Sequence, residues 1–549
     1  MAMAALANPV PAGWKARVVY ALLALAVVAP LLKPGFVLTL DMAFTPELRM
    51  PDNLTSSYLF RALLHVLNFV VPSQVLQKLL LFLVFFLAGI GMHRLMLALR
   101  KNADIYSTLG TYFGGLLYAI NPFTYDRLMA GQYSVLLGYA LLPFFVRSLL
   151  LFFQKPAARS AIYVAAWMIS VSIVSIHTLG LVAVFVLIAT IVMLRKKQLR
   201  QNIVHYGLLA AAIFVVASSY WLVPLCLGKG ATATEIASFT ASDNAAFATT
   251  GDNDLAKVAH VASLQGFWLE DRQLYVLPND QVPGWPLFVA ALWGIALFGV
   301  YVLWRQGQRT ICIIFVISTL AGILLASGIF NASLMHLPLF AGYREPQKFD
   351  GLVALGLSLC AGVGVITVLR YAHQELQKNS TIFVGCILFL IPIILTSTIF
   401  WGARGQLSAR QYPSGWAEAN RQLNADRNDF QTLFLPWHLY MHFDFAGRTI
   451  INPAPDYFDK PVIVSDNPEF EGSKPPSSTS AQRQVGQLLI DNPEPAEFAK
   501  KLAGLDIKYI TLARDNDFQE YTSLVQSPHF KLQYQSASIE LYRNERWRE

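Results

Sequence analysis

Long apolar runs separated by short polar breaks fill the first 401 residues of the chain. A helix that crosses a bilayer needs roughly 20 mostly apolar residues, and eleven runs approach that length. They lie at residues 16–32, 78–98, 104–121, 134–153, 161–177, 179–194, 205–226, 285–304, 310–328, 350–369 and 381–401. The pattern predicts an α-helical polytopic membrane protein with about eleven transmembrane helices.

Two of these runs need interpretation. The stretch 161–194 is too long for one helix and has a polar break from Ser175 to Thr178, so it predicts two short spans. The first run follows Lys15 and Arg17, as in a signal peptide, but no small-x-small cleavage motif precedes Lys33. We therefore interpret it as an uncleaved helix.

The pattern changes after residue 401, where short segments of mixed polarity predict a small α/β domain at 402–549, separate from the transmembrane body at 1–401. Expected helices are Ser414–Arg427 and Pro495–Leu502, expected strands are Phe430–Leu435 and Ile507–Leu512, and Phe530–Tyr542 is expected to form a terminal hairpin.

Composition agrees with this division. Of 549 residues, 55% are hydrophobic and 14% are charged, against about 25% charged in soluble domains. Residues 402–549 hold 16 basic and 19 acidic residues, whereas the body holds 26 and 15. The basic excess thus belongs to the membrane body, and we predict no nucleic-acid partner. The four cysteines lie in or at the end of apolar runs without metal or disulfide spacing: Cys226, Cys312, Cys360 and Cys386.

Basic residues predict the orientation in the membrane. If the N-terminus is cytoplasmic, the inner segments contain fifteen basic residues against only Asp104 and Glu375. Short cytoplasmic loops of membrane proteins carry such an excess. Since eleven spans are an odd number, the C-terminal domain is expected outside. We predict a multi-pass protein of the plasma (inner) membrane with its longer loops on the extracytoplasmic face.

The first outer loop, residues 33–77, carries the first acidic residue of the chain, Asp41. An ionisable group at a membrane boundary is a functional candidate by default. Further along, Arg61, His65 and Asn68 are spaced by four and three residues within apolar sequence that ends at Pro72. That spacing predicts an amphipathic helix lying in the membrane interface.

Three further outer loops stand out. One runs from Asn121 to Tyr133, and one at 227–284 is long and polar, as in lids or disordered segments. The last, 329–349, ends in Tyr343-Arg344-Glu345-Pro346-Gln347-Lys348-Phe349.

Several motifs together resemble polytopic glycosyltransferases of the C superfamily (GT-C), and most nearly the arabinofuranosyltransferase-like and YfhO-like bacterial membrane proteins. They are Asp41, Asn121-Pro-Phe with Gly131-Gln132, Ser219-Tyr-Trp-Leu-Val-Pro224, Tyr343-Arg-Glu-Pro346, Ile507-Lys-Tyr-Ile510 and Ile539-Glu-Leu-Tyr-Arg-Asn544. The resemblance implies an enzyme that moves a sugar from a polyprenyl-phosphate lipid to a cell-envelope glycan or glycolipid outside the cytoplasm.

Such transfer needs a base for the acceptor hydroxyl and positive charge for the departing phosphate. The resemblance makes Asp41 the candidate base, with Asp52 and Glu47 as alternative acids in the same loop. Arg344 and Lys348, on either side of Glu345, are the candidates for phosphate binding. Their alternative role is to brace the start of the next helix.

The substrate-binding set also includes Arg127, Gln132 and His177. Arg127 is a second choice for phosphate, although a local pair with Asp126 is the simpler interpretation. His177 could contact phosphate or acceptor, but a lone histidine in an apolar segment is more often a core residue. Met42, rather than a second acid, follows Asp41. No metal ligand or other cofactor is therefore predicted, although a divalent metal is not ruled out.

Two other functions fit a protein of this composition. A transporter or flippase of lipid-linked glycans should show charged residues at the bilayer midplane or broken inverted-repeat helices, and the only clearly mid-span charge is Arg147. A non-catalytic scaffold whose external domain binds glycan would not need Asp41. The distribution of charge favours the enzyme.

Overall fold

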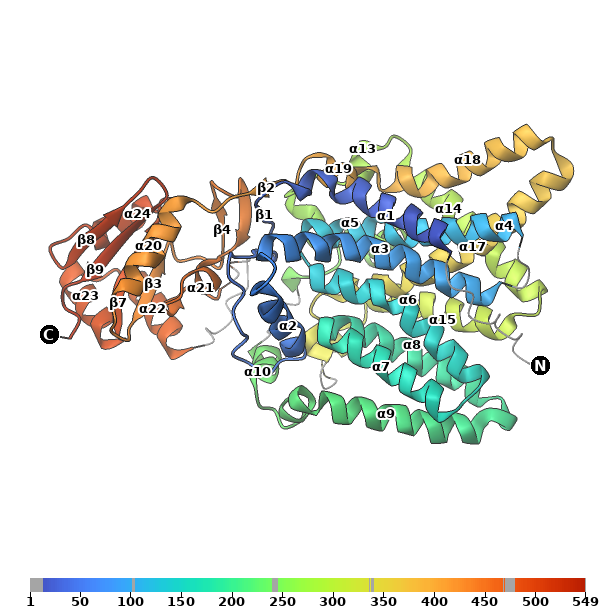
Figure 1. The fold of residues 1–549 in the computed structure, drawn as a ribbon, viewed down its shortest axis with the longest axis horizontal. Coiled ribbons are helices and arrows are strands. Elements are labelled where there is room, and N and C mark those ends of the chain that lie inside the picture. Colours follow the sequence, from blue (N-terminus) through green and yellow to red (C-terminus); the bar gives the residue numbers. More distant parts are fainter. Residues whose placement is uncertain are drawn as a thin grey trace.

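The computed structural model describes residues 13–100, 104–238, 245–334, 336, 340–467, 469 and 479–548. Within these ranges, each of the eleven predicted spans is a helix (Figure 1). The helices are α1 (Trp14–Val28), α3 (Ser73–Leu99), α4 (Ile105–Ala119), α6 (Tyr133–Gln154), α7 (Ala158–Val174), α8 (Ile176–Leu194), α9 (Lys197–Cys226), α14 (Trp285–Arg305), α15 (Arg309–Ala326), α17 (Asp350–Glu375) and α18 (Lys378–Leu395).

Among the described residues, nine of these helices are long and apolar enough to cross a membrane, when α1 and α17 are counted with the short turns that extend them. The other two are shorter, because α4 has 15 residues and α7 has 17. The predicted break in 161–194 is confirmed. Ser175 has an extended backbone and its side chain accepts a hydrogen bond from the Thr178 amide, which starts α8.

Some boundaries differ from the prediction. α9 begins at Lys197 rather than near 205, because Lys, Gln and Arg are good helix formers and extend the helix beyond its apolar run. The last span ends at Leu395 rather than 401, and a left-handed turn follows at Trp401–Ala403. An apolar run in the sequence does not show where the backbone turns back in this way.

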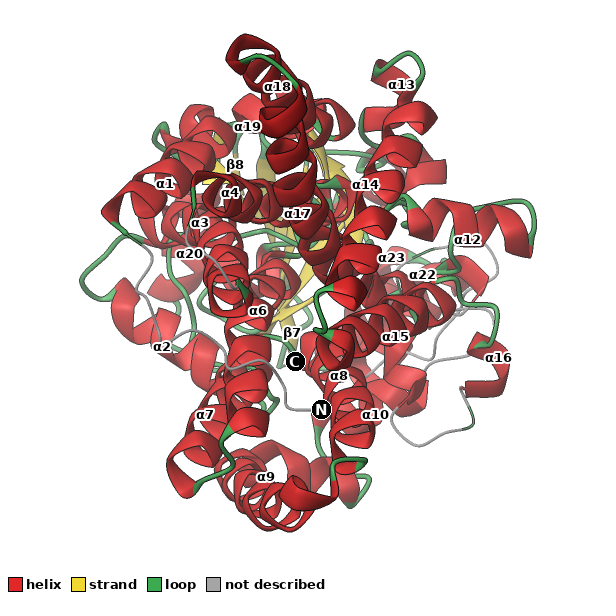
Figure 2. Cartoon of the chain, turned by 90° about the vertical axis from the view of Figure 1, so that its right-hand side faces the viewer, coloured by secondary structure: helices red, strands yellow, loops and turns green. Residues whose placement is uncertain are grey.

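α17 lies in the middle of the bundle when the molecule is seen along its long axis (Figure 2). It packs against α14, α4 and α15, and most of its residues are buried. α14 approaches α17 so closely that Gly299 faces the Cys360 carbonyl with no room for a side chain. By contrast, α9 and α18 are mostly exposed in their apolar segments, as suits helices at the edge of a bundle that faces lipid.

Shorter helices connect the bundle at the end nearer the C-terminal domain. α2 occupies the predicted amphipathic segment, with Phe60 and Leu64 buried and Leu59, Leu63 and Val66 exposed. The other short elements are α5 (Pro122–Met129), α10 (Ala231–Ser238), α12 (Asp254–Ala262), α13 (Pro278–Gln281), α16 (Asn331–Leu334) and α19 (Phe400–Arg404), with α2 at Tyr58–Asn68 and 3₁₀ turns η1 (Ala29–Leu32), η2 (Glu270–Arg272), η3 (Phe340–Tyr343), η4 (Pro346–Phe349) and η5 (Ser397–Ile399).

α5 replaces most of what the sequence suggested was a loop. Asn121 caps it, because its side chain accepts a hydrogen bond from the Thr124 amide at 3.1 Å and the Asn121 amide donates to the Thr124 hydroxyl at 3.0 Å. Pro122 then occupies the first helical turn. A reciprocal cap followed by proline is a helix-start signal.

The C-terminal part forms the expected small α/β fold, around a five-stranded sheet of order β6-β3-β7-β9-β8. β6, β3 and β7 are parallel, whereas β9 is antiparallel to both β7 and β8. Its elements are β2 (Ala409–Arg410), α20 (Ser414–Ala425), β3 (Gln431–Leu435), β4 (Tyr440–Phe443), β5 (Arg448–Ile451), α21 (Ala454–Tyr457), β6 (Val462–Ile463), α22 (Ser480–Asp491), α23 (Pro495–Gly504), β7 (Ile507–Ala513), α24 (Gln519–Val525), β8 (Phe530–Gln535) and β9 (Ile539–Asn544).

The first loop joins this sheet domain to the helical bundle (Figure 1). β1 (Phe36–Val37) pairs antiparallel with β2, and the Ile451 amide donates to the Leu40 carbonyl at 2.8 Å. The Tyr412 hydroxyl donates to the Phe44 carbonyl at 3.1 Å. The chain on either side of Asp41 is thus hydrogen-bonded to segments that follow the last bundle helix.

The other side of the loop rests on the turn between α5 and α6. The Asp41 amide donates to the Ala130 carbonyl at 3.0 Å, and the Thr39 hydroxyl donates to the Met129 carbonyl at 2.6 Å. Gly131 has φ +74°, and a Cβ there would lie 2.6 Å from the Met42 amide nitrogen and overlap the Thr39 carbonyl. Only glycine fits this approach.

Gly131→Ala should therefore destabilise the protein by at least roughly 1–3 kcal/mol, the cost of left-handed backbone at a non-glycine residue, with the overlap in addition. The measurement is the melting temperature of the detergent-solubilised protein. Gly207→Ala is the matched control, because Gly207 lies in α9 with open space around its Cα. Equal melting temperatures for the two variants would contradict this account of the loop.

Candidate functional site

Asp41 lies on the loop between α1 and α2, where both carboxylate oxygens are hydrogen-bonded. The Tyr440 hydroxyl donates to Oδ1 at 2.7 Å, and the Gln132 amide nitrogen donates to Oδ2 at 3.2 Å. Tyr440 comes from β4 of the C-terminal domain, and Gln132 from the turn before α6. Two segments far apart in the sequence therefore fix one carboxylate.

Gln132 links Asp41 to a second, deeper group of charges. Its side-chain nitrogen also donates to Glu345 Oε2 at 3.2 Å, and its side-chain oxygen accepts from Arg127 Nη1 at 2.8 Å. An amide that bonds to a cation through its oxygen and to two carboxylates through its nitrogen has its orientation fixed. Gln132 thus joins the Asp41 carboxylate to the Glu345 ion pairs.

Glu345 is the centre of those ion pairs. Arg127 Nη1 lies 2.8 Å from Oε2, and Lys348 Nζ lies 3.4 Å from Oε1. The three side chains are between 1% and 8% exposed, so the charges are paired inside the protein. Burial alone would raise the pKa of Glu345, but the charges of Lys348 and Arg127 outweigh it and hold the pKa well below its ordinary value.

Arg127 does not form the local pair with Asp126 that the sequence suggested as the simpler interpretation. Its guanidinium binds Glu345 and lies over the Phe267 ring, 4.0 Å from the centroid. Asp126 instead accepts a hydrogen bond from the Tyr275 hydroxyl at 3.1 Å. Adjacent residues of a helix point in different directions, and α5 is helical here.

Arg344 and His177 border the Glu345 group. The Arg344 guanidinium lies 4.4 Å from the centroid of the Phe247 ring, and its charge acts on Tyr440. The His177 ring packs edge-on against Tyr343, with 5.7 Å between centroids, and the Tyr343 hydroxyl donates to the His177 carbonyl at 3.2 Å. Asp41, Gln132, Glu345, Arg127 and Lys348 are thus connected directly, and Arg344 and His177 lie beside them.

A cavity of about 330 Å³ opens beside Asp41, between α2, the first loop and the C-terminal domain. Solvent reaches the Asp41 side chain there. The lining includes two cations, two acids, an amide and an aromatic ring: Arg49, Arg61, Asp41, Asp456, Asn452 and Tyr133. Such a mixture suits a polar ligand with several hydroxyl groups or an anionic group.

The pKa of the Asp41 carboxyl is above its ordinary value, chiefly because the surrounding protein removes water from the charged form. The bond from Tyr440 lowers the pKa, and the nearby Glu345 carboxylate raises it further. Asp41 therefore has a solvent-reached face, fixed oxygens and increased basicity, which are the properties of a general base.

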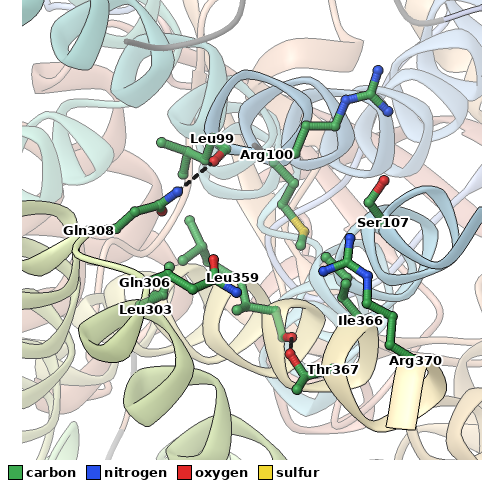
Figure 3. Close-up of a pocket in the computed structure, with 12 residues that line it drawn as sticks. Leu99, Arg100, Ser107, Leu303, Gln306, Gln308, Leu359, Ile366, Thr367 and Arg370 are labelled. Carbon is green, nitrogen blue, oxygen red and sulfur yellow. Dashed lines mark hydrogen bonds between the residues drawn. The ribbon is translucent and has the colours of Figure 1, made fainter. Parts of the chain in front are cut away.

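Another cavity, of about 300 Å³, lies at the opposite end of the bundle, where α3 ends and α4 begins. Figure 3 shows the residues that line it. The residues that line it include Arg100, which follows α3, Ser107 of α4, Gln306 and Gln308 of the turn after α14, and Arg370 of α17. It contains none of the residues proposed from the sequence. Asp104, which binds Arg370 at 2.7 Å, places a negative charge next to it.

Among the described residues, no group of three or more His, Cys, Asp or Glu side chains has the arrangement to hold a metal ion. The alternative acids Asp52 and Glu47 are exposed and do not line the cavity beside Asp41.

Sequence reasoning missed Tyr440, Asn452 and Asp456, which come from the C-terminal domain. The run Pro436-Trp437-His438-Leu-Tyr440 was visible as an aromatic cluster after a strand. Nothing in the run itself shows that Tyr440 bonds to a residue 399 positions earlier.

Glu345→Gln would remove the counter-charge of two buried cations. Breaking a buried ion pair from one side costs about 3–5 kcal/mol, so the variant should melt far below the wild type in detergent. Glu418→Gln is the control, because Glu418 pairs with an exposed arginine, Arg421, and such pairs contribute little. If the two substitutions lowered the melting temperature equally, the Glu345 group would not be a structural centre.

Comparison with known proteins relates this fold to one family. Residues 52–542 match the family model described as "Alpha-(1->3)-arabinofuranosyltransferase, N-terminal GT-C domain". No curated protein matches the sequence.

Among solved structures, arabinofuranosyltransferase AftD from Mycobacteria superposes with a TM-score of 0.67 at 14% identity, covering 98% of this chain. A mutant of that protein superposes with a TM-score of 0.62 at 15% identity, also over 98% of this chain. This chain spans only 40% and 42% of those two chains, and likeness at such identity shows the fold. Because the family model matches well over half of the sequence, the chain belongs to the family of GT-C domains found at the N-terminus of alpha-(1->3)-arabinofuranosyltransferases.

Proposed function

We propose that this protein is a membrane glycosyltransferase that moves a sugar from a polyprenyl-phosphate donor to a cell-envelope glycan or glycolipid on the extracytoplasmic face. The observation that carries the proposal is the Asp41 carboxylate, held by Gln132 and Tyr440 at the edge of a polar cavity in a GT-C family fold. The family description makes an arabinofuranosyl group the first donor sugar to test.

Asp41 acts as the general base. The acceptor hydroxyl attacks the anomeric carbon of the sugar, and its proton passes to the Asp41 carboxylate. The bond from the anomeric carbon to the phosphate oxygen breaks, and its electron pair leaves with polyprenyl phosphate. Attack by one nucleophile on the face opposite the leaving group inverts the anomeric centre. The raised pKa of Asp41 increases its ability to take the proton.

Positive charge near Asp41 compensates for the leaving phosphate. Arg127, Arg344 and Lys348 bring positive charge close to the Glu345 and Asp41 carboxylates. We assign the phosphate to Arg344 and Lys348, with Arg127 supplying an attractive field at longer range. His177 lies within that field and lines the same region.

The cavity beside Asp41 receives the reacting groups. Asp456, Asn452 and Tyr133 offer hydrogen-bond partners and an aromatic ring for a carbohydrate, while Arg49 and Arg61 can approach an anion. The exposed apolar face of α2 lies next to this cavity and gives a lipid-linked substrate a surface to approach along.

Asp41→Asn should lower transfer from polyprenyl-phosphoryl arabinofuranose at least about 100-fold, which is the usual contribution of a general base. Product formation with purified protein in liposomes is the measurement. Asp52→Asn and Glu47→Gln are the controls and should keep activity close to the wild type. Wild-type transfer by Asp41→Asn would contradict the base assignment. Movement of the lipid-linked sugar across the bilayer without a new glycosidic bond would support a flippase.

The kcat/KM of the wild-type protein should fall as the pH is lowered through the pKa of Asp41, because protonation removes the base. Since that pKa is raised, the loss should occur at a pH above about 3.9, the ordinary value for aspartate. In Asp41→Asn this acidic limb should be absent from the residual activity. An unchanged limb in the variant would show that another group titrates.

The proposed orientation can be tested with single cysteines in a variant whose four native cysteines are replaced by alanine. Lys531→Cys lies on exposed β8, and Lys155→Cys lies in the exposed turn between α6 and α7 at the opposite end of the bundle. A membrane-impermeant maleimide should label only the first in intact cells and both after lysis. Labelling of Lys155→Cys alone in intact cells would show that the orientation is the opposite of the one proposed.

A further inference from the structure

The hydroxyl that binds Asp41 Oδ1 comes from a domain that begins after the last bundle helix. Tyr440 lies at the start of β4, and in the β4–β5 hairpin it is opposite Ile451. The bond to Oδ1, at 2.7 Å, is the shorter of the two side-chain bonds to the carboxylate. The sheet domain therefore contributes directly to the environment of the proposed base.

The same hairpin holds the backbone next to Asp41. The Ile451 amide donates to the Leu40 carbonyl at 2.8 Å, and Leu40 has φ +27°, a conformation that a leucine adopts only when its surroundings impose it. Ile450, Met441 and Phe443 of the hairpin are buried, so the hairpin is anchored in the core. The hairpin therefore holds both the Asp41 side chain and the Leu40 main chain, from the side opposite the α5–α6 turn.

The two oxygens of the carboxylate differ in their partners. Oδ1 accepts a short bond from a phenol, whereas Oδ2 accepts a longer bond, 3.2 Å, from an amide that also serves Glu345. A short bond from a hydroxyl to a carboxylate is among the stronger hydrogen bonds in proteins. It occupies Oδ1 and lowers the basicity of the whole carboxylate, so Oδ2, which has the longer bond, is the oxygen left to accept a proton.

We propose that Tyr440 is a positioning residue for sugar transfer: its hydroxyl holds Oδ1 so that Oδ2 takes the acceptor proton. The C-terminal domain is then part of the active site. This inference rests on the proposed role of Asp41 as the base. Tyr440 acts through Asp41 and is not assigned a contact with substrate.

The charges around Asp41 make this role measurable. Gln132, Glu345 and Lys348 face the carboxylate from the bundle, Arg344 acts on Tyr440, and the cavity wall adds charged groups from the first loop, α2 and the C-terminal domain: Arg49, Arg61 and Asp456.

Among the groups that lower the pKa of Asp41, the Tyr440 hydroxyl has the largest effect. It opposes the rise caused by burial and by Glu345. If the hydroxyl is removed, the pKa of Asp41 should rise further. The acidic limb of kcat/KM should then move to higher pH.

Tyr440→Phe tests the proposal, and Tyr412→Phe is its matched control. Tyr412 also donates a hydroxyl bond from the C-terminal domain to the first loop, but to the Phe44 carbonyl rather than to Asp41. In Tyr440→Phe, kcat should fall roughly tenfold or more, because the lost orientation of the carboxylate outweighs its gain in basicity, with KM little changed and the acidic limb displaced upward. Tyr412→Phe should leave the limb where it is in the wild type.

The double variant Asp41→Asn/Tyr440→Phe provides a second readout. If the hydroxyl acts only through the carboxylate, its removal should not reduce the residual activity of Asp41→Asn any further. An additive loss would overturn the proposal. So would a Tyr440→Phe variant with wild-type kcat and pH profile, or one with lower kcat and an undisplaced acidic limb.

These outcomes are separable from a failure of the proposed function. If Asp41→Asn is fully active, the base assignment itself is wrong. If Asp41→Asn is inactive while Tyr440→Phe matches the wild type, only the role of Tyr440 is wrong. Melting temperatures of both tyrosine variants should lie close to that of the wild type, and the activity comparison is made at a temperature where all variants are folded.

Discussion

The rest of the site depends on the ion pairs that the buried Glu345 carboxylate forms with Arg127 and Lys348. An isolated carboxylate inside a protein is costly, and only paired charges and hydrogen bonds make its burial tolerable. Arg127 and Lys348 supply the charges, and Gln132 supplies a hydrogen bond. Those partners come from α5, the turn before α6 and the turn before α17. One acid thereby fixes three connecting segments of the bundle at the end where Asp41 lies.

The Glu345 ion pairs include residues that the sequence analysis proposed for phosphate binding. Lys348, one of the residues proposed to bind substrate phosphate, is buried against Glu345, so it also stabilises this end of the bundle. The cations Arg127 and Lys348 adjoin Glu345, and the Asp41 carboxylate joins the same network through Gln132. A field from fixed, dry charges needs no rearrangement during a reaction. In the proposed reaction, the two cations would stabilise the fold and also favour an anionic leaving group.

Local patterns predicted the helices well because a membrane span depends on the apolar character of its own residues. The break at Ser175 and the cap at Asn121 are likewise local, since their partners lie three residues away. The site was less accessible to such reasoning. Asp41 was identified as a lone acid after an apolar run, but Tyr440 could not be connected with it. β4 and β5 have only four residues each, and their contact with Leu40 spans some four hundred residues of sequence. No window along the chain contains that information.

The pairing of β1 with β2 determines when, during synthesis, the loop that carries Asp41 acquires its shape. The loop that carries Asp41 leaves the ribosome early, whereas its partners in β2, β4 and β5 are synthesised only after every bundle helix. Contacts of such long sequence separation form late in folding, and domains are completed in the order of synthesis. The shape of the segment around Asp41 is therefore fixed only near the end of synthesis. A truncated chain that stops at the membrane would contain the carboxylate but not the strand that shapes its loop.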